Sequence, residues 1–349
     1  MIAKNKKRKE KEWKDKGITK YISIDIIESV LMHMNPKDAM RLSTICKEWK
    51  ATTQQCDPTM HKTPWLLNVV NSNYFLHSTI DKDMSFTIKI PNIPPRKLCN
   101  WGCFHGWLVL EHHRFSLYNP FTRVRLDLPR HKHGIMDFRY MSSAPTNPDC
   151  VILVSHINDL YIWRPGDKTW IIQQNMNVID YRSILNFQGK FYALDYYTGN
   201  LVCFQVAPFR IKIMDVPPPT EFYRVLRRWI YLVESCGELL LVCLIFNLNT
   251  SKVYIFKLDF ENKTWIKVKS LGDRALFLSG NHCDQHGISI SACETGYHRS
   301  IYLIDWLSKY VYIMRNRKIK RIYKGLQSDC IPLGSLQVNV EIENNCCIS

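Results

Sequence analysis

The sequence predicts a mainly β protein in which a short α-helical segment at the N-terminus precedes a β-propeller of about six blades. Helical periodicity is confined to the first 50 residues of the chain. Beyond them, short apolar or alternating runs are bounded by turn residues, which indicates strands. These strands recur with a period of roughly 40–50 residues, and such a period is typical of propeller blades.

Length and composition agree with this fold class. A chain of 349 residues with 46% hydrophobic residues can bury a large core, in one large domain or in two unequal ones. The aromatic content of 12% suits a β-rich fold. The 13 cysteines show no paired spacing and their number is odd, so we interpret them as reduced thiols, mostly buried as small hydrophobic side chains.

The net charge of +16 suggests a nucleic-acid partner until its location is considered. Residues 4–16 carry eight basic and three acidic side chains, and residues 309–324 carry seven basic side chains and no acidic one. These two segments hold most of the excess, so the rest of the chain is nearly balanced. A basic face spread over a folded domain is not indicated, and no nucleic-acid partner is expected.

The N-terminal residues 1–20 are predicted to be a basic disordered tail. A short Lys/Arg cluster in this tail is a candidate nuclear-import signal, and a plain solvated tail is the alternative. Charge continues where the apolar core of a secretory signal would begin, and the longest apolar run has only eight residues. We therefore expect a nuclear or cytoplasmic protein without a transmembrane segment. The candidate import residues are Lys6, Lys7, Arg8 and Lys9.

Two short amphipathic helices follow the tail. Apolar residues recur at helical spacing over residues 26–34 and again over residues 42–49. Asn35 offers an N-cap for the second helix, and Pro36 occupies the first helical position, where proline is tolerated. Two helices of this length cannot bury both apolar stripes by themselves. They need a partner, either in the same chain or in another one.

The strand-rich part contains two pairs of matching segments. Asp167–Trp170 and Asn262–Trp265 each place a polar turn before a tryptophan and lie 95 residues apart. Gly189–Tyr192 and Gly237–Leu240 each open a strand after a glycine and lie 48 residues apart. The clearest predicted strands are 107–110, 115–118, 124–128, 151–154, 160–163, 170–172, 191–194, 201–206, 211–216, 239–246, 253–260, 265–268 and 300–304.

The helical segment resembles an F-box, whose usual form begins Leu-Pro-x-Asp and ends Val-Cys-Lys-x-Trp-Arg. This chain has Ile22–Asp25 at the start, Asp38–Ser43 in the middle and Ile45–Lys50 at the end, with Ser23 in the position where the family usually has proline. The resemblance implies docking on a Skp-type adaptor and, through it, on a cullin. An ordinary helical hairpin packed on its own domain is the alternative. The implied adaptor-binding residues are Ile22, Ile24, Asp25, Ile27, Leu31, Met34, Leu42, Ile45, Cys46 and Trp49.

The strand-rich part resembles the KIB-type propeller of plant F-box proteins. The landmarks are Thr63–Leu67, His105–Leu108, Asn119–Thr122, Tyr231–Val242 and Leu271–Leu278. The implied organisation is an F-box with its linker over residues 21–60, a propeller over 61–330 and a C-terminal tail over 331–349. From residue 307 onward the chain departs from the family by becoming basic. Membership implies an architecture and a complex, but no substrate.

No residue pattern points to catalysis. The sequence has no Gly-x-Gly pair and no Walker lysine motif, which argues against the common nucleotide-binding loops. Neither His282 and His286 nor the group of Cys99, Cys103 and His105 has the spacing of a common zinc site. We interpret Asp273 and Arg274 as a turn acid and a structural ion pair. No catalytic, cofactor-binding or metal-binding residue is predicted.

The last four residues, Cys346–Ser349, match a C-a-a-X prenylation box with a terminal serine, which favours a farnesyl group on Cys346. One farnesyl chain holds a membrane only weakly, so a second signal is needed, and the basic segment 315–324 is a candidate. A membrane partner is expected only if Cys346 is modified.

These features together predict the substrate-recognition subunit of a Skp-cullin-F-box ubiquitin ligase, with the propeller binding an unidentified target protein. Such a subunit is not itself an enzyme. The alternatives are a protein that binds nucleic acid through its basic ends, a scaffold outside any ligase, and a propeller hydrolase. The hydrolase is disfavoured because no paired-carboxylate or metal motif is found.

Overall fold

The computed structural model divides the chain into two compact units, residues 1–62 and 63–349. In the first unit the structure describes residues 26, 29, 30 and 34. In the second it describes residues 65–70, 73–78, 85–88, 99–111, 114–120, 123–131, 137–156, 159–174, 181–224, 228–246, 251–279, 286–295, 299–304, 308–313, 318–324 and 330–332.

The described residues of the first unit lie in the segment predicted as the first amphipathic helix. Ile26, Ser29 and Val30 are helical. Ile26 is 55% exposed and Val30 is 40% exposed, whereas Met34 is half-buried. Two apolar side chains one helical turn apart are therefore open to solvent.

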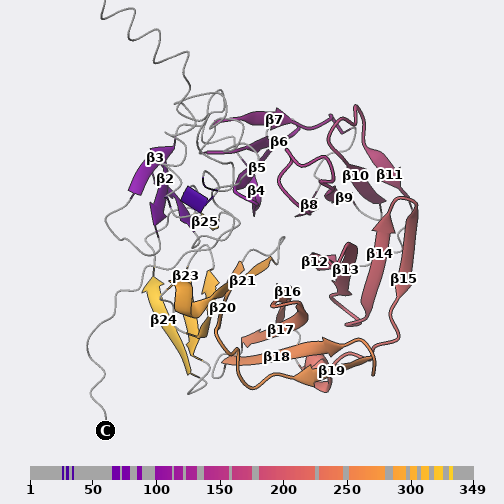
Figure 1. The fold of residues 1–349 in the computed structure, drawn as a ribbon, viewed down its shortest axis with the longest axis vertical. Helices are drawn as coiled ribbons and strands as arrows, with labels where there is room; N and C mark the ends of the chain where they lie inside the picture. Colours follow the sequence, from indigo (N-terminus) through magenta and orange to yellow (C-terminus); the bar gives the residue numbers. More distant parts are fainter. Residues whose placement is uncertain are drawn as a thin grey trace, which may run out of the picture. The chain divides into compact units, whose positions relative to one another are not determined.

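Within the described ranges of the second unit, the strands form six sheets, five with four strands and one with five (Figure 1). The first sheet has the order β25 (Cys330–Pro332), β1 (Trp65–Val70), β2 (Asn73–Ser78), β3 (Ser85–Ile88). The second is β4 (Cys99–Phe104), β5 (Trp107–Glu111), β6 (Phe115–Tyr118), β7 (Arg125–Asp127). The third, from the inside outward, is β8 (Asp137–Met141), β9 (Ile152–His156), β10 (Asp159–Trp163), β11 (Ile171–Gln173).

The other three sheets follow in chain order. The fourth is β12 (Tyr181–Phe187), β13 (Lys190–Asp195), β14 (Leu201–Val206), β15 (Phe209–Ile213). The fifth is β16 (Arg228–Ser235), β17 (Glu238–Phe246), β18 (Ser251–Asp259), β19 (Thr264–Lys267). The sixth is β21 (Gly287–Ser291), β20 (Arg274–Ser279), β22 (Ser300–Ile304), β23 (Ser308–Ile313), β24 (Lys318–Lys324). Short helical turns, η3 (Thr220–Arg224) and α5 (Ala292–Thr295), lie between strands.

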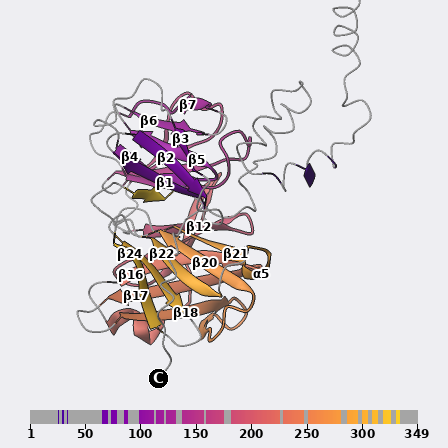
Figure 2. The ribbon, with the colours of Figure 1, turned by 90° about the vertical axis from the view of Figure 1, so that its left-hand side faces the viewer.

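One strand of each sheet lies toward a common centre, as Figure 1 shows. Along the ring, β25 contacts β4, β4 contacts β8, β8 contacts β12, β12 contacts β16, and β16 contacts β21. Figure 2 shows the propeller from the side, with β1 and β2 of the first sheet in indigo to purple and the sixth sheet in orange to yellow. This arrangement confirms the predicted mainly β fold and its propeller.

The first sheet joins the two ends of the second unit. Its inner strand β25 comes from the C-terminal part of the chain and pairs antiparallel with β1, with Leu66 opposite Pro332 and Asn68 opposite Cys330. The strands β1, β2 and β3 of this sheet are the first three that the structure describes in the unit. A late strand therefore completes a sheet that the early strands begin.

Three inner hairpins use the same kind of turn. The central residues are His105–Gly106, Gln188–Gly189 and Cys236–Gly237, and each pair has φ values near +50° and +75°. Positive φ at both positions is the mark of a type I′ turn, whose twist suits antiparallel strands. The glycine spacing that the sequence repeats therefore corresponds to a repeated hairpin.

The tryptophans at the repeat positions belong to the core. Trp170 and Trp265 are both buried. The indole Nε1 of Trp170 donates to the carbonyl oxygen of Pro129, 2.9 Å away, just after the second sheet ends. Trp170 therefore connects two neighbouring sheets as part of the core between them.

Most predicted strands are present, and Leu201–Val206 and Ser300–Ile304 match in both ends. The prediction of a strand over 211–216 was wrong in its bounds, because β15 runs from Phe209 to Ile213 and its first residue pairs with Val206. Within the part of the chain that the structure describes, no helix has the length and apolar character needed to cross a membrane.

Candidate functional site

The adaptor-binding prediction lies almost wholly outside the described residues. Met34 is described and half-buried. The other predicted adaptor contacts, Ile22, Ile24, Asp25, Ile27, Leu31, Leu42, Ile45, Cys46 and Trp49, lie outside, and so do the import cluster Lys6–Lys9 and Cys346. The described part of the chain offers a second candidate site, which no sequence pattern indicated.

This second site is a pocket of about 440 Å³ between the fifth and sixth sheets, which we call the inter-sheet pocket. Its walls come from the β16–β17 turn, from the segment that leads into β20, and from the end of β21. The lining residues are Ser235, Cys236, Glu238, Leu240, Val268, Ser270, Leu271, Gly272, Asp273, Arg274 and Ser291.

Part of the pocket wall is apolar. Leu240 is 3% exposed and Leu271 is 8% exposed, and both belong to the hydrophobic core between these sheets. Val268 is partly buried against the same core. The pocket therefore combines a fixed apolar wall with the polar groups described next.

A chain of hydroxyl groups holds Arg274 in the pocket wall. The Nε of Arg274 donates to the Oγ of Ser289 at 3.0 Å, and this Oγ lies 2.8 Å from the Oγ of Ser235. The guanidinium uses only Nε in this contact. Its two NH₂ groups have no acceptor among the described residues.

Asp273 has partners of its own. It accepts hydrogen bonds from the Oγ of Ser291 at 2.9 Å and from the backbone N–H of Cys293 at 3.0 Å, and Nε of Arg299 lies 3.9 Å away. Hydrogen bonds from Cys293 and Ser291, and then the positive charge of Arg299, lower the pKa of Asp273 below its ordinary value. The predicted pairing of Asp273 with Arg274 was wrong, because Ser289 holds Arg274 and Arg299 is the cation beside Asp273.

The other carboxylate of the pocket is also paired. The Nζ of Lys257 on β18 donates to Glu238 at 2.9 Å. Both acidic side chains of the inter-sheet pocket thus have a basic neighbour. Arg274 differs from them, because it forms no ion pair with a described residue.

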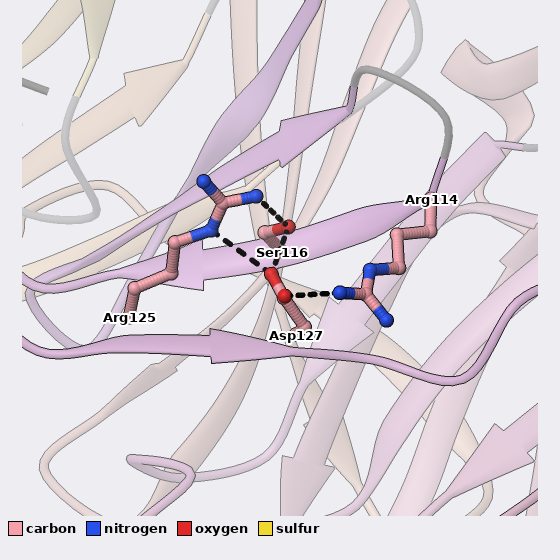
Figure 3. A network of polar contacts seen from close by, with 4 residues as sticks. All are labelled: Arg114, Ser116, Arg125 and Asp127. Atoms are coloured by element: carbon pink, nitrogen blue, oxygen red, sulfur yellow. Dashed lines mark hydrogen bonds and ion pairs between the residues drawn. The ribbon is translucent and has the colours of Figure 1, made fainter. Parts of the chain in front are cut away.

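A different polar network lies on the second sheet, at its outer strands (Figure 3). The carboxylate of Asp127 on β7 accepts hydrogen bonds from Arg114, from Ser116 at 2.8 Å and from Arg125 at 2.9 Å. Burial acts to raise the pKa of Asp127, but the bond from Ser116 and the two guanidinium groups outweigh it and lower the pKa. Asp127 and Ser116 face each other in the β6–β7 register, so this network fastens an outer strand.

Two histidines lie among the inner strands. The ring of His286 is 5.1 Å from that of Phe104 and 6.3 Å from that of Tyr140, between centroids. Nε2 of His105 lies 3.1 Å from the carbonyl oxygen of Met141. Burial, and then the proximity of His105, lower the pKa of His286 to about 4, so its ring is neutral at physiological pH. His282, the other histidine of the possible metal pair, lies outside the described residues.

Two family profiles match the chain, one in each of its parts. The profile described as KIB1-4 beta-propeller matches residues 75–324, most of the chain. The chain belongs to the KIB1-4 β-propeller family. The F-box domain profile matches residues 22–60. The family assignment made from sequence landmarks is therefore confirmed, in the order F-box and then propeller.

Several curated relatives whose names include the F-box match most of this chain and most of their own length. The chain is 24% identical over 286 residues to the F-box/kelch-repeat protein At1g57790 of Arabidopsis thaliana, covering 77% of this chain and 79% of that protein. It is 23% identical over 334 residues to the F-box protein At2g26160 of the same plant, covering 80% of this chain and 92% of that protein. The F-box protein At3g56470 is 24% identical over 272 residues, covering 73% of this chain and 71% of its own length.

Proposed function

We propose that this F-box protein is the substrate-recognition subunit of a Skp-cullin-F-box ubiquitin ligase, with its F-box docked on the adaptor and its propeller holding a target protein. The observation that supports this most directly is the presence, in one chain, of an F-box over residues 22–60 and a KIB1-4 propeller over 75–324. The first would connect the chain to the ligase, and the second supplies a large folded surface for a partner.

The subunit would accelerate ubiquitin transfer without chemistry of its own. Holding a target lysine near the charged conjugating enzyme raises its effective concentration, because a bimolecular encounter becomes an intramolecular one. The proposed role therefore requires two binding surfaces and no catalytic group.

Two exposed apolar residues of the first unit agree with a helix face that binds a partner. Ile26 and Val30 lie four residues apart on a helix and are both exposed. Residues at this spacing share one face of a helix, and an apolar face is stabilised when a partner covers it. We propose that the Skp-type adaptor covers this stripe, with the predicted contact residues from Ile22 to Trp49.

Co-purification with a Skp-type adaptor tests the proposal. The native chain should retain the adaptor, and Trp49→Ala or Leu31→Asp should lose it, because each change damages one apolar stripe. Glu48→Ala is the matched control, since Glu48 occupies the variable position of the Cys-Lys-x-Trp motif. Absence of the adaptor from the purified native chain would overturn the proposal.

Two targeting features remain proposals. We propose that Lys6, Lys7, Arg8 and Lys9 direct nuclear import, and that Cys346 accepts a farnesyl group which adds a membrane-bound fraction. Replacing the four basic residues with alanine should shift a fluorescent fusion from nucleus to cytoplasm. Cys346→Ser should remove the protein from the membrane fraction, and an unchanged distribution would dismiss the prenyl group.

A further inference from the structure

We propose that the inter-sheet pocket binds a carboxylate group of the target protein and that Arg274 is the residue that recognises it. This inference rests on the proposed function, because it names the chemistry by which the propeller would hold its target. Three features of the pocket support a carboxylate ligand: the geometry of Arg274, the balance of charges and the volume.

Arg274 is held in place before any ligand arrives. Its Nε is fixed by Ser289, and Ser289 is fixed by Ser235 on the neighbouring sheet. The two NH₂ groups remain without an acceptor among the described residues. A planar guanidinium fixed at one nitrogen offers a fork of donors that matches a carboxylate, and little side-chain entropy is lost when it binds.

The charge balance of the pocket favours a single negative charge. Asp273 is satisfied by Ser291, Cys293 and Arg299, and Glu238 is satisfied by Lys257. The positive charge of Arg274 is therefore the charge in the pocket that is not balanced by an ion pair with a described residue. A cationic side chain would be repelled by Arg274 and would find both carboxylates already engaged. A dianionic phosphate would meet those same carboxylates at close range, so a monoanion is the better match.

The size and lining of the pocket fit one side chain or one chain end. A volume of about 440 Å³ lies within the usual range for sites that bind a small group. Leu240, Leu271 and Val268 provide an apolar wall for the carbon atoms that carry the carboxylate. The ligand is therefore the carboxylate of a Glu or Asp side chain, or of a C-terminal residue, with apolar atoms next to it.

A peptide array probed with the full-length chain tests this inference. Each peptide is displayed in four forms, with Glu or Gln at a central position and with a free or amidated C-terminus. The native chain should prefer either Glu over Gln or the free over the amidated end, and the two comparisons distinguish a side chain from a chain terminus. Arg274→Gln should weaken binding to the selected peptides by about tenfold or more, because a hydrogen bond to a charged group is lost.

Two further variants separate recognition from folding. Arg274→Lys keeps the positive charge but not the fork, so it should bind with intermediate affinity. Arg210→Gln on the exposed face of β15 removes the same charge away from the pocket and should bind like the native chain. Equal melting temperatures of these proteins would show that the pocket variants are folded.

Several results would overturn the proposal. They are an array profile that Arg274→Gln leaves unchanged, a preference for Lys- or Arg-containing peptides, and a preference for phosphopeptides over their Glu counterparts. Adaptor capture is measured on the same samples. If the native chain captures no adaptor but still selects carboxylates through Arg274, the ligase role fails and the pocket assignment stands. If the native chain captures the adaptor but Arg274 has no effect on peptide selection, the pocket assignment fails and the ligase role stands.

Discussion

Gly287, the first residue of β21, packs directly against Val233 of β16. A Cβ added at Gly287 would come within 2.6 Å of Cγ2 of Val233 and within 2.8 Å of Cδ2 of Leu278. Val233 and Leu278 are both fully buried. The fifth and sixth sheets therefore approach each other at a point that has no room for a side chain.

Gly287→Ala should destabilise the propeller by about 1–3 kcal/mol, because a methyl group forced into a packed core displaces its neighbours. Urea unfolding, followed by tryptophan fluorescence, measures the effect. Adding Val233→Ala makes room at the same point, so the double variant should lose less stability than the sum of the two single changes. Strict additivity would show that the two residues do not press on each other.

Ser183→Ala should cost about 1–3 kcal/mol. The Oγ of Ser183 on β12 accepts a hydrogen bond from the backbone N–H of Leu232 on β16, at 2.8 Å, and both residues are buried. Alanine would leave that N–H without this acceptor in the interior. Thr198→Ala, at an exposed turn where Oγ1 accepts from the N–H of Asn200, is the control and should change stability by less than about 0.5 kcal/mol.

The stability of the propeller should fall as the pH drops from about 6.5 toward 4, in part because of His286. Its pKa is near 4 in the folded chain and near 6.5 when exposed, so the unfolded chain binds the proton first in this window. His286→Phe keeps ring contacts with Phe104 and should make the melting temperature depend less steeply on pH. His156→Gln is the control for removing a histidine, and an unchanged slope in His286→Phe would contradict the prediction.

Asp127→Asn should lower stability at neutral pH by about 0.5–1 kcal/mol, since a partly exposed ion pair contributes little. The folded-state pKa of Asp127 is lowered, so its contribution is present above the ordinary value and is lost as the pH falls through the folded value. The variant should therefore differ from the native chain at pH 7 and converge with it in strong acid. If the free energies of unfolding of the two proteins ran parallel between pH 7 and strong acid, the network around Asp127 would not be the cause of the difference.

Ser23→Pro should tighten adaptor binding by about two- to fivefold. Proline restricts the free chain, and a compatible proline is worth about 0.4–1 kcal/mol. Affinity for the purified Skp-type adaptor, measured by calorimetry, checks this. Thr44→Pro, within the predicted second helix, should weaken binding instead, because proline disrupts a helix interior. Equal affinities for Ser23→Pro and the native chain would mean that proline at this position brings no advantage.

The middle and outer strands of the sheets could largely be predicted from sequence, and most inner strands could not. Leu201–Val206 on β14 is apolar except for the exposed Gln205, and the sequence predicts this strand in full. On the inner strands, Ser183 and Ser235 interrupt the apolar pattern, because their hydroxyls bond to the next sheet rather than facing solvent. Hydrogen bonds between sheets remove the alternation on which strand prediction depends.

The inter-sheet pocket was beyond the reach of sequence reasoning for a related reason. Ser235, Arg274 and Ser289 come from three different strands, and no spacing along the chain links them. Asp273 and Arg274 are adjacent in sequence, which suggested a pair, yet they engage different partners. The sequence could identify the turn at Asp273, but it could not identify Ser289 and Arg299 as the residues that pack beside it.

The pairing of β25 with β1 has a consequence for how the protein is made. Translation adds about 5–20 residues per second, so β1 waits for its inner partner for a time on the order of tens of seconds. During that interval one edge of β1 is open to other strands, which invites mispairing. The F-box, at residues 22–60, precedes all of these strands, so a chain interrupted before β25 would still contain it. If the chain docks on a Skp-type adaptor as proposed, premature termination would yield a subunit that competes with the complete chain and lacks the finished propeller.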